Sequence, residues 1–155
     1  MQEDAELHYG LGQVYALMGE REKAVESYER ALELSMNEAN RYREFARRIS
    51  SREDKILLRL GLLYGETGDH AQAMEYYEAA LFENPLSADA EYNLAVSLCN
   101  LDRTDEAIKH CQKLMLNGKT VWGDDSCAEK AYDLHADLSA RKAHAERIQS
   151  LTPIQ

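Results

Sequence analysis

The sequence has few of the residues that mark a disulfide scaffold, a linker or a membrane span. Among its 155 residues are three cysteines, two prolines and eight glycines. The cysteines form neither a C-x-x-C pair nor a zinc-binding quartet with histidines, so we interpret them as free thiols in a reducing compartment. No apolar run approaches the roughly 18 residues of a membrane span, and the start, MQEDAELHYG, lacks the order of a secretion signal. These absences predict a cytoplasmic protein that does not enter a membrane.

Basic residues are also in the minority. The chain has 18 lysines and arginines against 28 acidic residues, a formal charge of -10. Because such a chain repels phosphates, we do not expect it to bind nucleic acid. Segment 41–59 is the exception, with seven basic and three acidic residues. It could dock an acidic partner, including the acidic surface of a second copy.

The sequence offers no constellation of catalytic or cofactor-binding residues. It contains no G-x-x-x-x-G-K-[ST], G-x-G-x-x-G, H-E-x-x-H or G-x-S-x-G motif. Its five histidines include no i, i+4 pair that would place two metal ligands on one helix face. We therefore predict a protein that is not an enzyme and has no cofactor, metal site or catalytic residue.

Three windows of 34 residues repeat one pattern, at 5–38, 54–87 and 88–121, and the last two adjoin without a gap. Each window has a leucine followed by a small residue, and a large residue lies three positions after the small one. Later in the window comes a second small residue and, four positions after it, a second aromatic residue or its substitute. The members, window by window, are Leu11, Gly12, Tyr15, Ala24 and Tyr28; Leu60, Gly61, Tyr64, Ala73 and Tyr77; and Leu94, Ala95, Leu98, Ala107 and Cys111.

This spacing resembles the tetratricopeptide repeat, a 34-residue helix–turn–helix unit with the pattern W-x2-L-G-x2-Y…A-x3-F…P. The windows cover 102 of the 155 residues, but the tryptophan position holds His8, Leu57 and Glu91, and only the second window keeps its closing Pro85. The resemblance implies an all-α fold, an α-solenoid whose helix pairs stack into a right-handed superhelix. We expect one domain spanning 1–155.

Small residues at fixed positions account for the pattern physically. Gly12 and Gly61 on the first helices of their pairs, and the alanines of the second helices, allow the two helices of a pair to approach closely. Gly19 and Gly68 fall where each first helix must stop, a position that suits a left-handed cap. Asp69 is expected to cap the helix that follows.

Segment 39–53 lies between the first two windows and has two interpretations. Apolar residues continue the helical stripe of the first window through Ala39, Tyr42, Ala46 and Ile49, which predicts one long helix from about 22 to 49. Its end would expose Tyr42, Phe45 and Ile49 as a self-association surface, and a homodimer would follow. The alternative is a break near Asn37 and a separate short helix.

The last helix is predicted to cap the array. Ser126 and Glu129 form an S-x-x-E capping box ahead of an apolar stripe, so we expect a helix over 126–149 with a polar outer face. Trp122, in the loop before it, is expected to pack beneath this helix.

The resemblance also implies where a partner binds. In the family, the first helix of each repeat lines a concave face that holds an extended or helical peptide. Carried over to this chain, the exposed positions are Glu6, Tyr9, Gln13 and Leu17; Lys55, Leu58, Arg59, Leu62 and Glu66; and Asp89, Tyr92, Asn93, Val96 and Asn100. The groove residues we predict among them are Tyr9, Gln13, Lys55, Arg59, Leu62, Tyr92, Asn93 and Val96. The alternative is that the extra helix or the terminal helix covers some of them.

One subclass of the family binds the acidic tails of heat-shock chaperones through a clamp of lysines, an arginine and asparagines. At the clamp positions this chain has Tyr9 and Gln13, Arg59, and Asp89 and Asn93. The clamp is absent, so we do not expect such a tail as partner.

The sequence thus predicts a non-catalytic scaffold that binds a peptide segment of a partner protein. One alternative is a small acidic chaperone of the secretion or co-chaperone type, although the insertion at 39–53 does not suit the secretion chaperones. Another is a self-assembling structural element in which the long helix exchanges between two copies.

Overall fold

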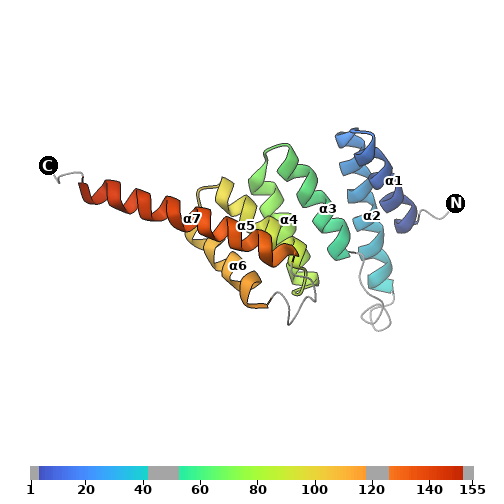
Figure 1. The fold of residues 1–155 in the computed structure, drawn as a ribbon. Coiled ribbons are helices and arrows are strands. Elements are labelled where there is room, and N and C mark those ends of the chain that lie inside the picture. The colour runs from blue at the N-terminus through green and yellow to red at the C-terminus, as the bar shows by residue number, and fades with distance from the viewer. Residues whose placement is uncertain (1–3, 42–52, 118–125, 152–155) are drawn as a thin grey trace. The chain divides into compact units, whose positions relative to one another are not determined.

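The structure is a computed structural model that describes residues 4–41, 53–117 and 126–151. Within these ranges all regular structure is helical, which confirms the all-α prediction. The helices are α1 (Ala5–Leu17), α2 (Arg21–Arg41), α3 (Glu53–Glu66), α4 (His70–Glu83), α5 (Ala88–Asn100), α6 (Thr104–Asn117) and α7 (Ser126–Leu151). The chain divides into two compact units, Met1–Pro85 with α1–α4 and Leu86–Gln155 with α5–α7 (Figure 1).

The first two helix pairs are held by a tyrosine ring lying on a glycine. A Cβ atom added to Gly12 would lie 2.6 Å from Cδ1 of Tyr28, and one added to Gly61 would lie 2.5 Å from Cε1 of Tyr77. Real Cβ atoms do not approach another carbon so closely, so both positions require glycine. The packing role predicted for the small residues is confirmed here.

Three turns of the same design connect the helices within the pairs. Gly19 and Gly68 have φ angles of 77° and 84°, as the sequence predicted, and the third turn places Asp102 at φ 58° instead. In each turn, the residue that follows the positive-φ residue donates its backbone N–H to the carbonyl oxygen five positions earlier, in the last turn of the helix. These bonds are Glu20 to Tyr15 at 2.9 Å, Asp69 to Tyr64 at 3.0 Å and Arg103 to Leu98 at 2.9 Å. This hydrogen bond is the one that closes a Schellman motif.

The start of α4 is capped as expected. Oδ1 of Asp69 accepts a hydrogen bond from the Gln72 amide at 3.1 Å. The bond satisfies one of the free N–H groups in the first turn of the helix.

The core of the first unit joins α2 to α3. Its buried members are Ala24, Tyr28, Ala31, Ile56, Leu60 and Leu63. Two polar contacts fasten the same pair of helices, because Ser35 Oγ donates to Glu53 at 2.9 Å and Arg21 lies 3.5 Å from Glu66. The α2 helix therefore packs against both α1 and α3.

The second helix of the first window is longer than a repeat requires. It runs from Arg21 to Arg41 without a break at Asn37, so the expectation of a break there is wrong. Its 21 residues span about 31 Å at 1.5 Å per residue. Tyr42, Phe45 and Ile49 lie outside the described residues, and the continuation to residue 49 stays a prediction.

The second unit packs α7 against α6 around small side chains. Its buried cluster consists of Ala95, Cys111, Leu114, Cys127 and Ala131. Cys111 and Cys127 are buried free thiols, as interpreted from the sequence, whereas Cys99 is half-buried. The α7 helix begins at Ser126, as predicted, and from Ala140 to Ser150 every residue is exposed. Trp122 lies outside the described residues.

Candidate peptide-binding surface

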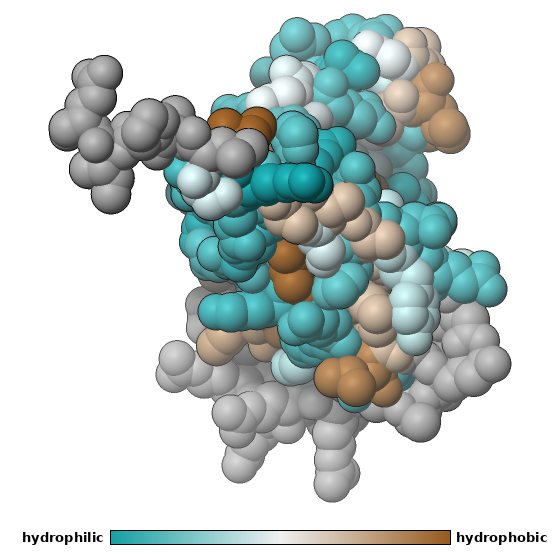
Figure 2. Space-filling view, turned by 60° about the vertical axis from the view of Figure 1, so that its left-hand side comes forward, coloured by the Kyte–Doolittle hydropathy of each residue, from teal (hydrophilic) through white to brown (hydrophobic). Residues whose placement is uncertain are grey.

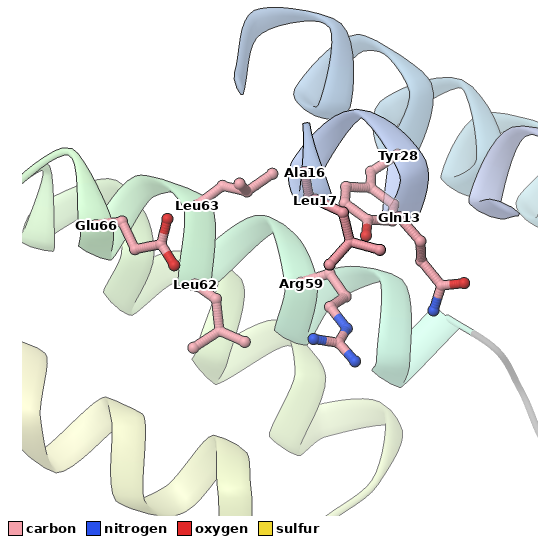
Figure 3. A pocket seen from close by; sticks show the side chains of 8 residues that line it. All are labelled: Gln13, Ala16, Leu17, Tyr28, Arg59, Leu62, Leu63 and Glu66. Carbon is pink, nitrogen blue, oxygen red and sulfur yellow. The ribbon is translucent and has the colours of Figure 1, made fainter. Parts of the chain in front are cut away.

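An open groove of about 380 Å³ lies in the first unit, between α1 and α3 (Figure 3). Its walls are mainly apolar, with polar groups at intervals. The lining residues are Gln13, Ala16 and Leu17 from α1; Tyr28 from α2; and Arg59, Leu62, Leu63 and Glu66 from α3.

The structure brings three of the eight predicted groove residues into this groove, namely Gln13, Arg59 and Leu62. Tyr9 is half-buried instead, with its ring centroid 5.7 Å from that of Tyr28. Lys55 is exposed on α3 and does not line the groove. The groove is therefore lined from about the middle of α1 and of α3 onward.

Sequence reasoning missed Tyr28, Ala16 and Leu63 as lining residues. Tyr28 lies on the second helix of its repeat, at a position that the repeat pattern assigns to the core, and its side chain is 1% exposed. Because no Cβ at Gly12 blocks it, the ring fits between α1 and α3 and still contributes to the groove. The Gly12 and Tyr28 pair was the signal that could have shown this.

Arg59 dominates the electrostatics of the groove. Its side chain is exposed, and in the described part of the chain no carboxylate lies within ion-pair distance of it. Glu66, at the other end, is paired with Arg21 at 3.5 Å. Burial raises the pKa of the Tyr28 phenol, and the charge of Arg59 only partly opposes this rise. At neutral pH the groove thus presents the positive charge of Arg59 and the Gln13 amide between apolar walls, a neutral phenol, and at its other end the Glu66 carboxylate paired with Arg21.

The predicted groove residues of the second unit have a different environment. Tyr92 is half-buried against the core, and Lys130 of α7 places its Nζ 5.9 Å from the ring centroid. Burial raises the pKa of the Tyr92 phenol. Nδ2 of Asn93 donates at 2.8 Å to the carbonyl of Asp89 in its own helix. The terminal helix therefore covers part of Tyr92, which was the alternative left open by the sequence.

A buried ion cluster in the second unit was not foreseen. Glu91, at the tryptophan position of the third window, is 0% exposed. Its oxygens lie 2.6 Å from Nζ of Lys113 and 2.8 Å from Nδ1 of His110, both on α6. Burial alone would raise the pKa of the Glu91 carboxyl, but the hydrogen bonds from His110 and Lys113 outweigh it and lower the pKa.

This cluster joins α5 to α6 where a large apolar side chain is expected. A carboxylate at an apolar position of one helix, with two candidate donors on the next helix, was the signal in the sequence.

The described residues lack two other kinds of site. No group of three or more histidine, cysteine, aspartate or glutamate side chains there has an arrangement that could hold a metal ion. Among the described helices, none combines the length and the apolar character needed to cross a membrane.

Helix pairs of this geometry define a class of helical-repeat scaffold, and comparison with known families gives its name. Two models of the tetratricopeptide repeat match residues 5–35 and 58–115, together 89 of the 155 residues. The chain belongs to the tetratricopeptide-repeat family. The family predicted from the 34-residue windows is therefore confirmed, and with it the α-solenoid class.

Relatives and solved structures agree with this assignment. The chain is 27% identical over 135 residues to photosystem I assembly protein Ycf3 of Cuscuta gronovii, a match that covers 87% of this chain and 61% of the relative. The corresponding protein of Acaryochloris marina is 30% identical over 61% of this chain and 50% of its own length. The chain thus spans about three-fifths or less of these relatives.

Among solved structures, the TPR2B domain of yeast Sti1, solved in complex with an Hsp70 peptide, has a TM-score of 0.69 at 14% identity. That match covers 88% of this chain and 97% of the Sti1 chain. The Sgt2 domain of Aspergillus fumigatus has a TM-score of 0.69 at 16% identity, covering 97% of this chain and 86% of that one. At such identities the likeness shows the fold alone.

Proposed function

We propose that this chain is a non-catalytic interaction module that binds a peptide segment of a partner protein in the groove between α1 and α3. The observation that carries the proposal is the open groove in which Gln13, Arg59 and Leu62 converge. Membership of the tetratricopeptide-repeat family supports it, because such repeats typically serve as interaction scaffolds without catalytic activity.

The groove chemistry suggests which peptide fits. Leu17, Leu62 and Leu63 offer apolar contact for one or two aliphatic or aromatic side chains. Arg59 and Gln13 can donate hydrogen bonds to carbonyl oxygens or to one acidic side chain of the ligand. Because Arg59 is the one cation among the described residues of the groove lining and Glu66 is an anion in it, we expect a selected peptide to combine apolar side chains with a single acidic one, unlike a tail that carries several carboxylates.

Binding to short peptides tests the proposal directly. Peptides selected from a displayed library should bind the wild-type chain, and Arg59→Glu should weaken the best of them at least about tenfold, or about 1.4 kcal/mol. Glu33→Ala is the matched control, because Glu33 is an exposed charge on α2 that lies away from the groove lining. Equal affinity of wild type and Arg59→Glu, with loss of binding in Glu33→Ala, would contradict the proposal.

The ligand we propose is not the acidic tail of a heat-shock chaperone. A structural neighbour at 16% identity, the first repeat domain of RPAP3, was solved with the HSP90 peptide SRMEEVD. In this chain Tyr9 is half-buried against Tyr28 and Asp89 places a negative charge at a clamp position. We expect SRMEEVD to show no saturable binding in isothermal titration, and a micromolar dissociation constant would contradict this.

A second candidate is a chaperone that holds another protein during assembly. The observation that favours it is the similarity to an assembly protein over 87% of this chain. A chaperone of this kind should suppress aggregation of an unassembled partner subunit and release it on assembly. The peptide module should instead remain bound to the mature partner, so co-purification before and after assembly separates the two.

A further inference from the structure

The first helix carries an apolar stripe in which three side chains are more than half exposed and one, Leu11, is half-buried. Leu7, Val14 and Met18 are 60%, 51% and 63% exposed, and Leu11 lies between them on the same face. The four positions follow the i, i+4, i+7, i+11 spacing of a helix face that packs against another helix. We call these four residues the α1 stripe.

The second repeat shows what this face does when it has a neighbour. Leu7, Leu11 and Val14 correspond, 49 positions later, to Ile56, Leu60 and Leu63 of α3. These three are 1%, 0% and 7% exposed, because they pack against Ala24, Tyr28 and Ala31 of α2. The α1 stripe thus has the chemistry of a buried helix–helix contact, although three of its four side chains are more than half exposed among the described residues.

Exposed apolar side chains are also concentrated on this helix. Ten large ones are exposed among the described residues, and four belong to α1 and its C-cap, Leu7, Val14, Leu17 and Met18. No other helix in the described part of the chain has more than two. On the face drawn in Figure 2, most of the surface is hydrophilic and the apolar residues form small separate patches. A contiguous apolar face of this kind usually marks a contact.

We propose that the α1 stripe is the contact surface of a homodimer, in which α1 of one copy packs antiparallel against α1 of a second copy. The stripe complements itself in this arrangement. Its positions are symmetric about the middle of the helix, so Leu7 of one copy lies opposite Met18 of the other, and Leu11 opposite Val14. This reciprocal pairing is what a two-fold axis requires.

Charge favours the antiparallel orientation. The first turn of α1 has Asp4 as its N-cap and Glu6 after it, and the last turn contains no basic residue. A parallel pair would place these carboxylates side by side. An antiparallel pair separates these carboxylates by the length of the helix, and it also aligns opposite ends of the two helix dipoles.

The stripe suits a symmetric contact between the two α1 helices better than a head-to-tail contact, in which α1 of one copy would pack against α7 of the next. A head-to-tail contact would need an apolar face on the last helix. The outer side of α7 exposes two large apolar side chains, Tyr132 and Ile148, which are 16 residues apart. Two separated side chains do not match a continuous stripe, so the contact closes as a dimer.

The dimer is expected to be weak. Thirteen residues of α1 extend about 20 Å, so one helix face buries less than the roughly 800 Å² per partner of a standard interface. A dissociation constant on the order of 100 µM is reasonable for such a contact. The proposal is independent of the peptide groove, because the groove lies on a different side of α1.

Sedimentation equilibrium from about 10 to about 500 µM, a range around that expected constant, tests the proposal. The wild-type mass should rise toward twice the monomer mass, and Leu7→Asp/Val14→Asp should remain monomeric. Leu116→Asp is the matched control, since Leu116 is an equally apolar exposed residue on α6. It should dimerise like wild type. Circular dichroism should show unchanged helicity in both variants.

Several results would overturn the proposal. One is a wild type that stays monomeric throughout, and another is dimerisation of Leu7→Asp/Val14→Asp at the wild-type concentration. Loss of the dimer in Phe45→Asp/Ile49→Asp alone would assign the contact to another segment. If the α1 variant fails to fold, NMR spectra of the wild-type backbone amides at increasing protein concentration provide the test. Chemical-shift changes confined to α1 would support the proposal. Changes elsewhere, or none, would contradict it.

Discussion

The second and third repeats fill the same positions with different chemistry. In the second repeat the ring of Tyr77 lies on Gly61, and Leu57 occupies the tryptophan position as a buried apolar residue. In the third repeat Cys111 replaces the ring, Ala95 replaces the glycine, and buried Glu91 stands at the tryptophan position.

The difference shows that the sizes of two facing residues vary together. A large ring requires a partner without a Cβ, whereas a thiol leaves room for a methyl group. The third repeat also replaces one apolar contact with a carboxylate and its two donors. A repeat position thus specifies that space be filled and polar groups be paired, and does not specify a residue.

Gly61→Leu should cause the largest loss of stability. The new side chain would begin 2.5 Å from the Tyr77 ring, and overpacking of this kind costs about 3 kcal/mol or more. Thermal and urea unfolding measure the loss. Gly10→Ala is the control, because a Cβ there meets nothing within 4 Å, and it should gain up to about 1 kcal/mol of helix propensity. An unchanged melting temperature for Gly61→Leu would show that Gly61 is not a close contact.

Cys111→Tyr should convert the third repeat halfway to the second. The ring would meet Ala95, and we expect a loss of about 1–3 kcal/mol. Adding Ala95→Gly should recover much of it, because the Gly61 and Tyr77 arrangement is then reproduced. Urea unfolding of the two variants measures the recovery. If the double variant is no more stable than Cys111→Tyr, the two residues do not adjust to each other.

Lys113→Met should lower the free energy of unfolding, because it removes one of the two hydrogen-bond donors to the buried Glu91 carboxylate. Glu91 would keep only His110, and loss of a donor to a buried charge costs about 1–3 kcal/mol. Glu91→Leu in the same chain should restore stability, since an apolar pair can replace a buried ion pair without loss. The double-mutant cycle is measured by urea unfolding. Simple addition of the two single effects would mean that the pair is not coupled.

The smallest expected effect is a pH dependence confined to the third repeat. Because the folded state lowers the pKa of Glu91, the unfolded chain binds the proton more readily. The stabilisation is therefore complete above the unfolded carboxyl pKa of about 4.3 and is lost as pH falls through the lower folded value. The stability difference between wild type and Glu91→Gln should shrink below about pH 4. A difference that stays constant from pH 7 to pH 3 would contradict this.

Sequence reasoning predicted the candidate groove only in part. Gln13, Arg59 and Leu62 follow from their positions on first helices, which the repeat spacing defines. Tyr28 could not be placed in the same way, because a core position on a second helix reaches the groove only where Gly12 leaves space. Tyr92 is half-buried for the opposite reason, since α7 lies over part of a ring that its own helix would expose.

What the sequence determined by itself is the local and periodic part of the protein. The 34-residue spacing, the left-handed turns at Gly19 and Gly68 and the Asp69 cap all depend on residues within one or two turns of each other. Only the tertiary structure decided exposure: Ile56 and Leu7 occupy the same repeat position, yet one is 1% and the other 60% exposed. Burial depends on which other helix lies against a residue, and that helix comes from elsewhere in the chain or from another molecule.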